Sequence, residues 1–307
     1  MNKRIALKID VDTERGTRIG VKNLLALFAK HNIHATFLFS LGPDNTGRAL
    51  KRIFRPGFLK KVSRTSVVST YGIKTLLNGV LWPGPNIAKK HAVLLREVEQ
   101  AGHEVGIHCY DHCKWQDYLF TWNESQTKTE FNRAVESFKN VFKKNPQAAG
   151  TPGWQANSNS LQAYDDAHLL YGSDCRGPHP FYPKIGEKIF QTLQVPSNLP
   201  TLDELVGRPE YPLEKITETL LQQCESRPED EVFTLHAELE GMRYLEWFEQ
   251  FIVAGQQRGF QFVPVDILAR KALENKSAIP VCELIQGEIE GRSGTLALQQ
   301  KESGNAY

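Results

Sequence analysis

Two carboxylates and three histidines stand where they could together hydrolyse an amide. Asp10 and Asp12 are two residues apart, and extended backbone directs alternate side chains to the same side. His108 and His112 are four residues apart, so one helical turn could present both imidazoles to a metal ion. His236 ends an apolar run and could supply the proton that a departing amine needs near neutral pH. These residue types suit metal-assisted hydrolysis.

Each motif also has a simpler explanation. Asp12 and Thr13 could merely cap the helix that follows them. Cys109 and Cys113 lie beside the histidine pair and could form a Cys/His zinc site, although such sites usually carry Cys-x-x-Cys pairs, which the sequence lacks. A single histidine such as His236 is more often a hydrogen-bonded core or surface group. The chemistry therefore requires the motifs to meet in space.

The predicted elements bring the motifs to one face of an α/β fold. Helical spacing of apolar residues predicts a helix over 24–31. Alternation of strands and helices indicates a mostly parallel sheet, whose carboxyl ends meet at one edge. Asp12, His108 and His112 could there form a site of two histidines and one carboxylate with open positions for water. Strands are predicted at 5–9, 35–41, 104–108 and 231–239.

Composition narrows the class of protein. The 307 residues are 40% hydrophobic and 23% charged, which is ordinary for a globular chain, and the net charge of +2 does not favour nucleic-acid binding. Five scattered cysteines indicate free thiols in a reducing compartment. The apolar opening is broken by Lys8 and ended by Asp10, so it reads as a strand and not a signal peptide. With no run of about 18 apolar residues, we expect a cytoplasmic protein without a transmembrane helix.

The stretch 44–83 interrupts the strand–helix alternation and is predicted to be an insertion. It holds eight basic residues and a single acid, a composition suited to an anionic membrane surface. A solvated basic loop packed on its own barrel or on a second subunit is the alternative. We expect one domain over 1–286 and a polar tail over 287–307 without an assigned element. The large apolar residues of the insertion include Phe54, Phe58, Leu59 and Trp82.

The order of the motifs resembles the polysaccharide-deacetylase family, in which Asp-x-Asp, His-x-x-x-His and Leu-His follow successive strands. Longer stretches look like the members that deformylate 4-deoxy-4-formamido-L-arabinose linked to undecaprenyl phosphate. The resemblance implies a distorted (β/α) barrel, one divalent metal ion and hydrolysis of a formamide on this sugar lipid. The products would be formate and the 4-amino sugar lipid, which serves lipid A modification. The stretches are 9–13, 15–18, 42–45, 173–177 and 236–241.

The resemblance also implies a role for each motif residue. Asp10 corresponds to the general base and His236 to the general acid. Asp12, His108 and His112 correspond to the metal ligands. Zinc, manganese, cobalt and nickel are all compatible with such a ligand set.

One position departs from the family pattern. The third motif usually has an arginine before Pro-x-Gly, whereas here Thr151 precedes Pro152. The cation beside the base is then absent or comes from elsewhere. Arg176 is a candidate, with a plain ion pair to Asp174 as the alternative. Trp154 could form the floor of a sugar site or pack in the core.

Arg15 and Arg18 stand near the start of the first predicted helix, where free amides and the helix dipole favour an anion. We expect them to hold the phosphate of the substrate, with an exposed basic turn as the alternative. Asp174, Arg176 and Glu238 lie in the stretches that resemble the deformylases and are further candidate substrate contacts. The expected partner is a lipid-linked sugar phosphate at the cytoplasmic face of the anionic inner membrane.

Two other functions remain open at this point. A deacetylase of chitin-like or peptidoglycan sugars would act outside the cytoplasm, which the absence of an export signal does not favour. A catalytically inactive sugar-lipid binding protein would tolerate the missing arginine. The complete set of metal and acid positions favours an enzyme.

Overall fold

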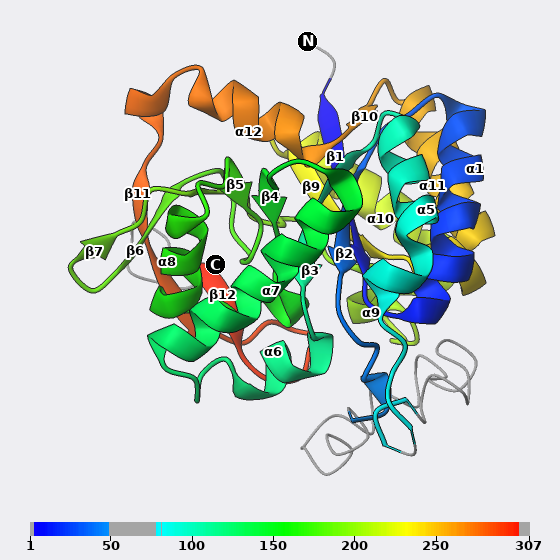
Figure 1. Ribbon diagram of the computed structural model, residues 1–307. Coiled ribbons are helices and arrows are strands. Elements are labelled where there is room, and N and C mark those ends of the chain that lie inside the picture. Colours follow the sequence, from blue (N-terminus) through cyan, green and yellow to red (C-terminus); the bar gives the residue numbers. More distant parts are fainter. Residues whose placement is uncertain (1–2, 49–77, 81, 301–307) are drawn as a thin grey trace.

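A computed structural model describes residues 3–48, 78–80 and 82–300 (Figure 1). Within these ranges, eight strands form a parallel sheet in the order β10-β1-β2-β3-β4-β5-β8, and β9 also pairs with β1. The strands of this sheet are β1 (Arg4–Val11), β2 (Thr36–Ser40), β3 (Glu104–Cys109), β4 (Ala148–Ala149), β5 (Tyr171–Gly172), β8 (Leu193–Gln194), β9 (Glu231–His236) and β10 (Gln261–Val263).

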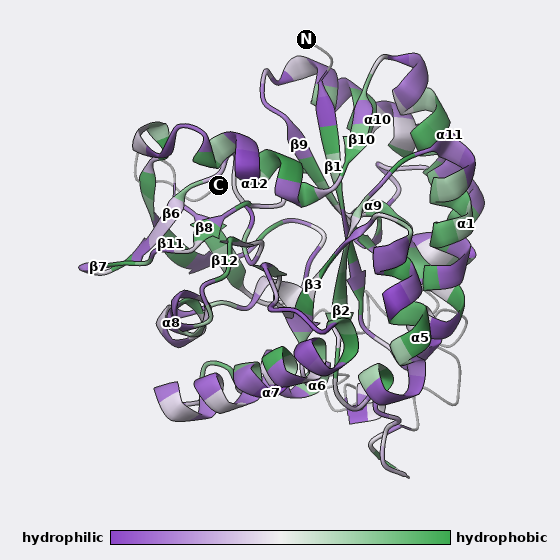
Figure 2. Ribbon diagram, turned by 45° about the horizontal axis from the view of Figure 1, so that its top comes forward, coloured by the Kyte–Doolittle hydropathy of each residue, from purple (hydrophilic) through white to green (hydrophobic). Residues whose placement is uncertain are grey.

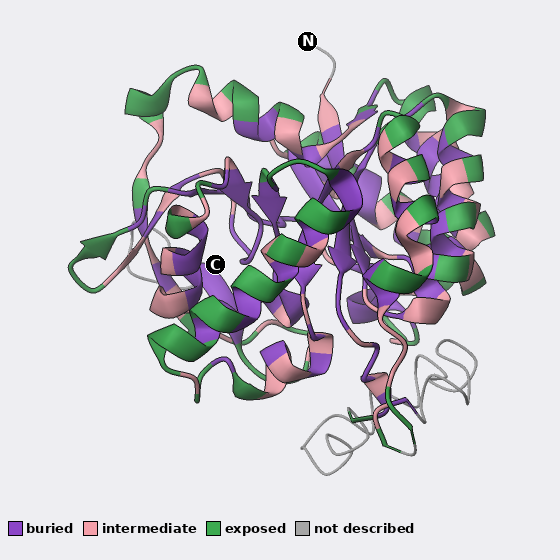
Figure 3. Ribbon diagram, viewed as in Figure 1, coloured by how far each residue is buried: buried purple, intermediate pink, exposed green. Residues whose placement is uncertain are grey.

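Strand β1 lies at the centre of the sheet and buries both of its faces. Leu7, Ile9 and Val11 belong to the main hydrophobic core. Lys8 and Asp10 alternate with them and are also buried, on the face that points into the curved sheet. Figure 3 shows buried strands surrounded by helices whose outer faces are exposed. The charged side chains of β1 therefore lie inside the fold.

The sheet closes irregularly between β8 and β9. The backbone amides of Asn198 and Leu199 both donate to the Val232 carbonyl at 3.3 Å, and Val232 N donates to Asn198 Oδ1 at 2.7 Å. Ser197 and Thr234 join their hydroxyls at 2.6 Å. Side chains and single backbone bonds thus replace a strand ladder here. The expectation of a distorted (β/α) barrel is confirmed.

Several helices begin at side-chain caps that satisfy free amides of the first turn. Asn86, Asp111, Asn123 and Asn157 are such caps. The α-helices are α1 (Lys22–His31), α5 (Ile87–Gln100), α6 (His112–Tyr118), α7 (Glu124–Phe142), α8 (Ser158–Asp166), α9 (Leu202–Leu205), α10 (Leu213–Ser226), α11 (Leu245–Gln257) and α12 (Val265–Leu273). Shorter turns are η1 (Gly16–Val21) and η4 (Leu239–Arg243), both π-helical, and η3 (Pro152–Trp154) and η5 (Lys276–Ala278), both 3₁₀.

The four predicted strands are confirmed, and the largest difference in their bounds is in the late strand. The late strand ends at His236 and not at 239, because the chain turns into η4. The strands β4, β5 and β8 were not predicted, since two residues are too few to produce a visible alternation. Figure 2 shows the apolar residues concentrated in the central strands and on the inner sides of the helices.

A second sheet corrects the expectation of a polar tail. Among the described residues its order is β12-β11-β6-β7. The tail expectation is wrong for 296–299, because Leu296, Ala297 and Leu298 are fully buried there. Leu296 and Leu298 pack against Trp154. The strands are β6 (Tyr182–Ile185), β7 (Lys188–Ile189), β11 (Val281–Gly287) and β12 (Leu296–Gln299).

Most of the predicted insertion, including Phe54, Phe58 and Leu59, lies outside the described residues. Its first described residues contact the residues next to His112. Asn45 Nδ2 donates to Asp111 Oδ2 at 2.6 Å. In the part of the chain that the structure covers, no helix is long and apolar enough to cross a bilayer.

Candidate active site

The side chains of Asp12, His108 and His112 converge at the carboxyl ends of β1 and β3. Asp12 Oδ1 lies 3.1 Å from His108 Nε2 and 3.4 Å from His112 Nε2. One donor atom from each residue lies within 4.8 Å of the other two. Within the described ranges, no other group of three histidine, cysteine, aspartate or glutamate residues meets this spacing. The predicted meeting of the two motifs is confirmed.

The orientation of these side chains fits a divalent cation. His108 Nδ1 lies 2.5 Å from the Gly150 carbonyl oxygen, which can only accept a hydrogen bond. Nδ1 therefore carries the proton, and the lone pair of Nε2 points toward Asp12. Asp12 Oδ1 is buried and has no hydrogen-bond partner. Asp12, His108 and His112 would hold the metal ion.

The cysteines near the histidine pair are engaged elsewhere. Cys109 Sγ lies 3.3 Å from Ser40 Oγ, and Cys113 Sγ donates to the Asn45 carbonyl at 3.2 Å. Burial raises the pKa of the Cys109 thiol, which disfavours the thiolate that a metal ion would bind. None of the five cysteines forms a disulfide, and all five are buried. The alternative of a Cys/His zinc site gains no support.

Asp10 stands beside this group on β1. Its Oδ1 is 3.8 Å from His108 Nδ1, is buried and makes no hydrogen bond. Its Oδ2 is 3.6 Å from Lys8 Nζ. Sequence analysis missed Lys8, although its two-residue spacing from Asp10 places it on the same face of the strand.

His236 ends β9 directly opposite Asp10 in the parallel register. Its Nδ1 is buried without a hydrogen-bond partner, and its backbone N–H donates to Glu240 Oε2 at 2.8 Å. Burial disfavours the charged imidazolium, but the carboxylates of Asp203, Asp12, Asp10 and Glu240 outweigh this and raise the pKa of His236. The ring is thus suited to carry a proton near the carboxylate pair.

Glu238 fixes the backbone that follows β1. Its Oε1 accepts hydrogen bonds from Asp12 N at 3.2 Å, Thr13 N at 2.9 Å and Thr13 Oγ1 at 2.7 Å. A Cβ at Gly16 would lie only 1.9 Å from that oxygen. Burial raises the pKa of Glu238 to about 8. These contacts give Glu238 a role in holding the Asp12 loop, and its contact with a substrate stays a prediction.

Two glycines let the turn after β1 meet the turn after β9. A Cβ at Gly20 in η1 would lie 2.0 Å from the Ala237 carbonyl oxygen. A Cβ at Gly241 in η4 would lie 2.8 Å from the Cα of Gly20. This close approach draws the loops that carry Asp12 and His236 together.

The partner of Arg176 is not Asp174, the nearby residue that the sequence suggests. Its Nη1 lies 2.9 and 3.0 Å from the two carboxylate oxygens of Glu204, and both side chains are buried. The proposed ion pair with Asp174 is therefore wrong. Asp174 accepts hydrogen bonds from Thr151 N at 2.7 Å and from the Tyr164 hydroxyl at 2.9 Å. Because breaking a buried pair costs roughly 3–5 kcal/mol, Arg176 is held by Glu204 and is not a free cation for the base.

Trp154 is 2% exposed and packs in the interior. Its Nε1–H donates to Ser197 Oγ at 3.2 Å. The cationic groups of Lys8, Arg176 and Arg292 lie 5.2, 5.3 and 4.4 Å from its ring centre. The structure favours core packing for Trp154. Direct substrate contact by Trp154, Asp174 or Arg176 stays a prediction.

The expected phosphate arginines flank and enter η1. Arg15 is its N-cap, and the more exposed Arg18 has its Nε 3.6 Å from Glu14 Oε1. The same oxygen accepts from Lys90 Nζ at 2.7 Å and lies 3.0 Å from His91 Nε2. Arg18 thus belongs to a cluster in which one carboxylate faces several basic groups.

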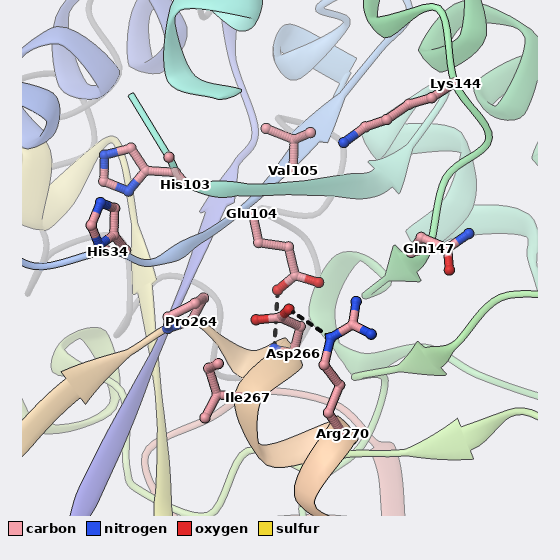
Figure 4. A pocket seen from close by; sticks show the side chains of 11 residues that line it. His34, His103, Glu104, Val105, Lys144, Gln147, Pro264, Asp266, Ile267 and Arg270 are labelled. Carbon is pink, nitrogen blue, oxygen red and sulfur yellow. Dashed lines mark hydrogen bonds and ion pairs between the residues drawn. The ribbon is translucent and has the colours of Figure 1, made fainter. Parts of the chain in front are cut away.

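A polar cavity of about 430 Å³ lies at the amino ends of β2 and β3 (Figure 4). Glu104 there accepts hydrogen bonds from the Tyr171 hydroxyl at 2.8 Å and from Asp266 N at 3.2 Å. Burial raises the pKa of Glu104 to about 7. Glu104 begins β3 whereas His108 stands near its end, so this cavity is separate from the candidate metal site.

The chain belongs to the polysaccharide deacetylase family, whose model matches residues 2–172. Two curated relatives share one name, "Probable 4-deoxy-4-formamido-L-arabinose-phosphoundecaprenol deformylase". The relative from Shewanella sediminis is 36% identical over 96% of this chain and 94% of its own. The relative from Wigglesworthia glossinidia brevipalpis is 33% identical over 93% of this chain and 99% of its own.

Solved structures of low sequence identity share the fold. A structure from Mycobacterium smegmatis assigned to the polysaccharide deacetylases has a TM-score of 0.65 at 17% identity, covering 94% of this chain and 96% of that one. Another from Pseudomonas aeruginosa PAO1 has a TM-score of 0.59 at 17% identity, covering 89% and 92%. These likenesses support the distorted barrel.

Removing one ligand should weaken metal binding. Purified protein should bind one divalent cation, and Asp12→Asn or His112→Gln should lower its affinity at least ~10-fold, because each removes a direct donor. Calorimetric titration and metal analysis after dialysis measure this. Cys113→Ser is the control and should keep the metal. Loss of metal in Cys113→Ser with retention in His112→Gln would overturn the assignment.

Proposed function

We propose that this chain hydrolyses the formamide of 4-deoxy-4-formamido-L-arabinose carried on undecaprenyl phosphate, in the modification of lipid A. The products are formate and the 4-amino sugar lipid. The main support is the convergence of Asp10, the group of Asp12, His108 and His112, and His236 at one edge of the sheet. The names of the curated relatives support this sugar lipid as the substrate.

Three groups of side chains divide the work. A divalent cation held by Asp12, His108 and His112 would polarise the formyl carbonyl and acidify water, and zinc, manganese, cobalt and nickel all suit these ligands. Asp10 accepts the proton of the attacking water at its unbonded Oδ1. The water oxygen forms its bond to the formyl carbon as that proton leaves.

His236 completes the reaction as the general acid. An amine anion is a poor leaving group, so the nitrogen must receive a proton as the carbon–nitrogen bond breaks. The pKa of His236 is raised by the carboxylates around it, with Asp203 the strongest of them, which favours the protonated ring against the effect of burial. His236 lies opposite Asp10 on the adjacent strand. One strand thus provides the group that accepts a proton, and its neighbour provides the group that donates one.

Changing either proton-transfer residue should abolish most turnover while the metal stays bound. Asp10→Ala and His236→Ala should each lower formate release by ~10²- to 10⁴-fold, the usual contribution of a placed acid or base. Formate release from the lipid-linked sugar is measured alongside metal content. Controls are Asp166→Ala and His31→Ala, which remove side-chain contacts to Lys128 and Glu249 away from the candidate site.

Other outcomes of this assay identify the rival functions. Faster hydrolysis of an acetylated sugar than of the formylated one would indicate a polysaccharide N-deacetylase. Tight binding of the sugar lipid by metal-loaded protein without formate release would indicate an inactive binding protein. If Asp10→Ala or His236→Ala releases formate at a near wild-type rate, the catalytic role of that residue is wrong.

Arg15 and Arg18 are proposed to hold the substrate phosphate. Replacing both with glutamine should raise KM ~10-fold or more for the phosphate-bearing substrate, since charge-assisted bonds to phosphate are lost. KM for a phosphate-free formamido sugar should not change. Arg133→Gln is the control, because Arg133 likewise pairs with a glutamate of its own helix. Equal losses on both substrates would contradict the role.

The segment 44–83 is proposed to dock the protein on the anionic inner membrane from the cytoplasmic side. Basic residues near such a surface contribute on the order of 1 kcal/mol each, and apolar side chains add buried area. Changing Phe54, Phe58 and Leu59 to serine should abolish sedimentation with vesicles that contain anionic lipid. Ile189→Ser, an exposed apolar residue of the second sheet, is the control. Absence of wild-type binding to anionic vesicles would contradict the proposal.

A further inference from the structure

Lys8 is a fully buried lysine on the central strand, beside the candidate base. An ammonium group is strongly unfavourable in the interior unless it is paired and hydrogen-bonded. Its partners therefore indicate why the fold keeps it. The residue is two positions before Asp10 on β1, so both side chains point to the same face.

The ammonium of Lys8 has three neighbours. Nζ donates to the Ser173 carbonyl oxygen at 3.0 Å. It lies 3.6 Å from Asp10 Oδ2 and 5.2 Å from the ring centre of Trp154. Among the described residues, Asp10 is the one carboxylate within ion-pair distance of Lys8. One backbone oxygen and one aromatic face thus hold the cation against the candidate base.

The surrounding backbone leaves little freedom for this cation. Ser173 directly follows β5, and its N–H donates to the Ala149 carbonyl at 2.8 Å, which ties it to β4. A Cβ at Gly150 would lie 3.4 Å from Lys8 Nζ and 3.0 Å from the Ser173 oxygen. The Gly150 carbonyl in turn accepts from His108. Carbonyl groups directly after two neighbouring strands, β4 and β5, therefore orient one metal-ligating histidine and the lysine.

We propose that Lys8 is the positioning residue for Asp10 in the reaction inferred above, on which this proposal rests. Its ammonium attracts Oδ2 at 3.6 Å, whereas Oδ1 lies on the side of His108, 3.8 Å from Nδ1, and is buried without a hydrogen bond. Lys8 thereby decides which oxygen of the base faces the attacking water. The cation beside the base comes from its own strand, because Thr151 replaces the expected arginine and Arg176 is bound to Glu204.

A purely structural role would also explain a buried lysine, namely neutralising Asp10 so that the barrel folds. The two roles differ in how Lys8 and Asp10 combine. A positioning residue acts through its target, so its loss has no further effect once the target cannot act. If the role is only structural, loss of Lys8 lowers the stability of the protein. Its effect on the rate is then the same whether residue 10 is aspartate or asparagine.

The test is a double-mutant cycle of Lys8→Met, Asp10→Asn and the combined variant. Lys8→Met should lower kcat ~10- to 100-fold, as loss of an orienting partner typically does, with KM and metal stoichiometry unchanged. In the Asp10→Asn background the same change should alter the residual rate by less than about 2-fold. Lys8→Arg should restore most of kcat because it keeps the cation. Lys128→Met is the control.

Three results would overturn the proposal: unchanged kcat in Lys8→Met, an equal loss from Lys8→Met with and without Asp10, or no recovery in a folded Lys8→Arg. If Lys8→Met does not fold, Lys8→Gln is judged by the same criteria. A crystal structure of the folded variant adds a readout without substrate, in which the Asp10 carboxylate should rotate from its position. If the wild-type protein releases no formate, the proposed function is wrong. If the Asp10 carboxylate keeps its position in the Lys8 variant, only the positioning role of Lys8 is wrong.

Discussion

The alternation of side chains along β1 is the constraint on which the rest of the structure depends. Leu7 and Ile9 face the helices, whereas Lys8, Asp10 and Asp12 follow the opposite phase. A slip of one residue would place three charges under the helices and remove the site. Pairing of β1 with both β2 and β9 opposes such a slip. One face of β1 thus packs in the core, and the other face carries residues of the candidate site.

Charged and polar side chains inside a barrel need hydrogen-bond partners, and the backbone after the shortest strands provides two of them. Strands β4 and β5 each stop after two residues, and the next carbonyl groups, of Gly150 and Ser173, are free to accept hydrogen bonds. The Gly150 carbonyl accepts from His108 Nδ1, and the Ser173 carbonyl accepts from Lys8 Nζ. A longer ladder would have used these oxygens for backbone pairing. The early end of these strands therefore helps to build the site.

The wall beside the site depends on the last part of the described chain. The Arg176 N–H donates to the Ala297 carbonyl at 3.0 Å, and Gln299 N–H donates to the Arg176 carbonyl at 2.8 Å. Leu298 packs on Trp154, which in turn faces Lys8. Strand β12 thus closes the apolar layer behind the buried cations. Lys8 and Arg176 are buried there, and burial strengthens their ion pairs and makes an unpaired charge costly.

The sequence by itself determined which residues form the candidate site and their approximate location. Asp12, His108 and His236 each stand near the end of a predicted strand, and parallel strands present their carboxyl ends at one edge. Only the tertiary structure decided which cation accompanies the candidate base Asp10 and where the last described residues pack. The sequence suggested Arg176 and did not indicate Lys8, because the partners of both lie in distant segments and two-residue strands leave no periodic pattern. Such long-range pairings are set by packing, which local propensity does not encode.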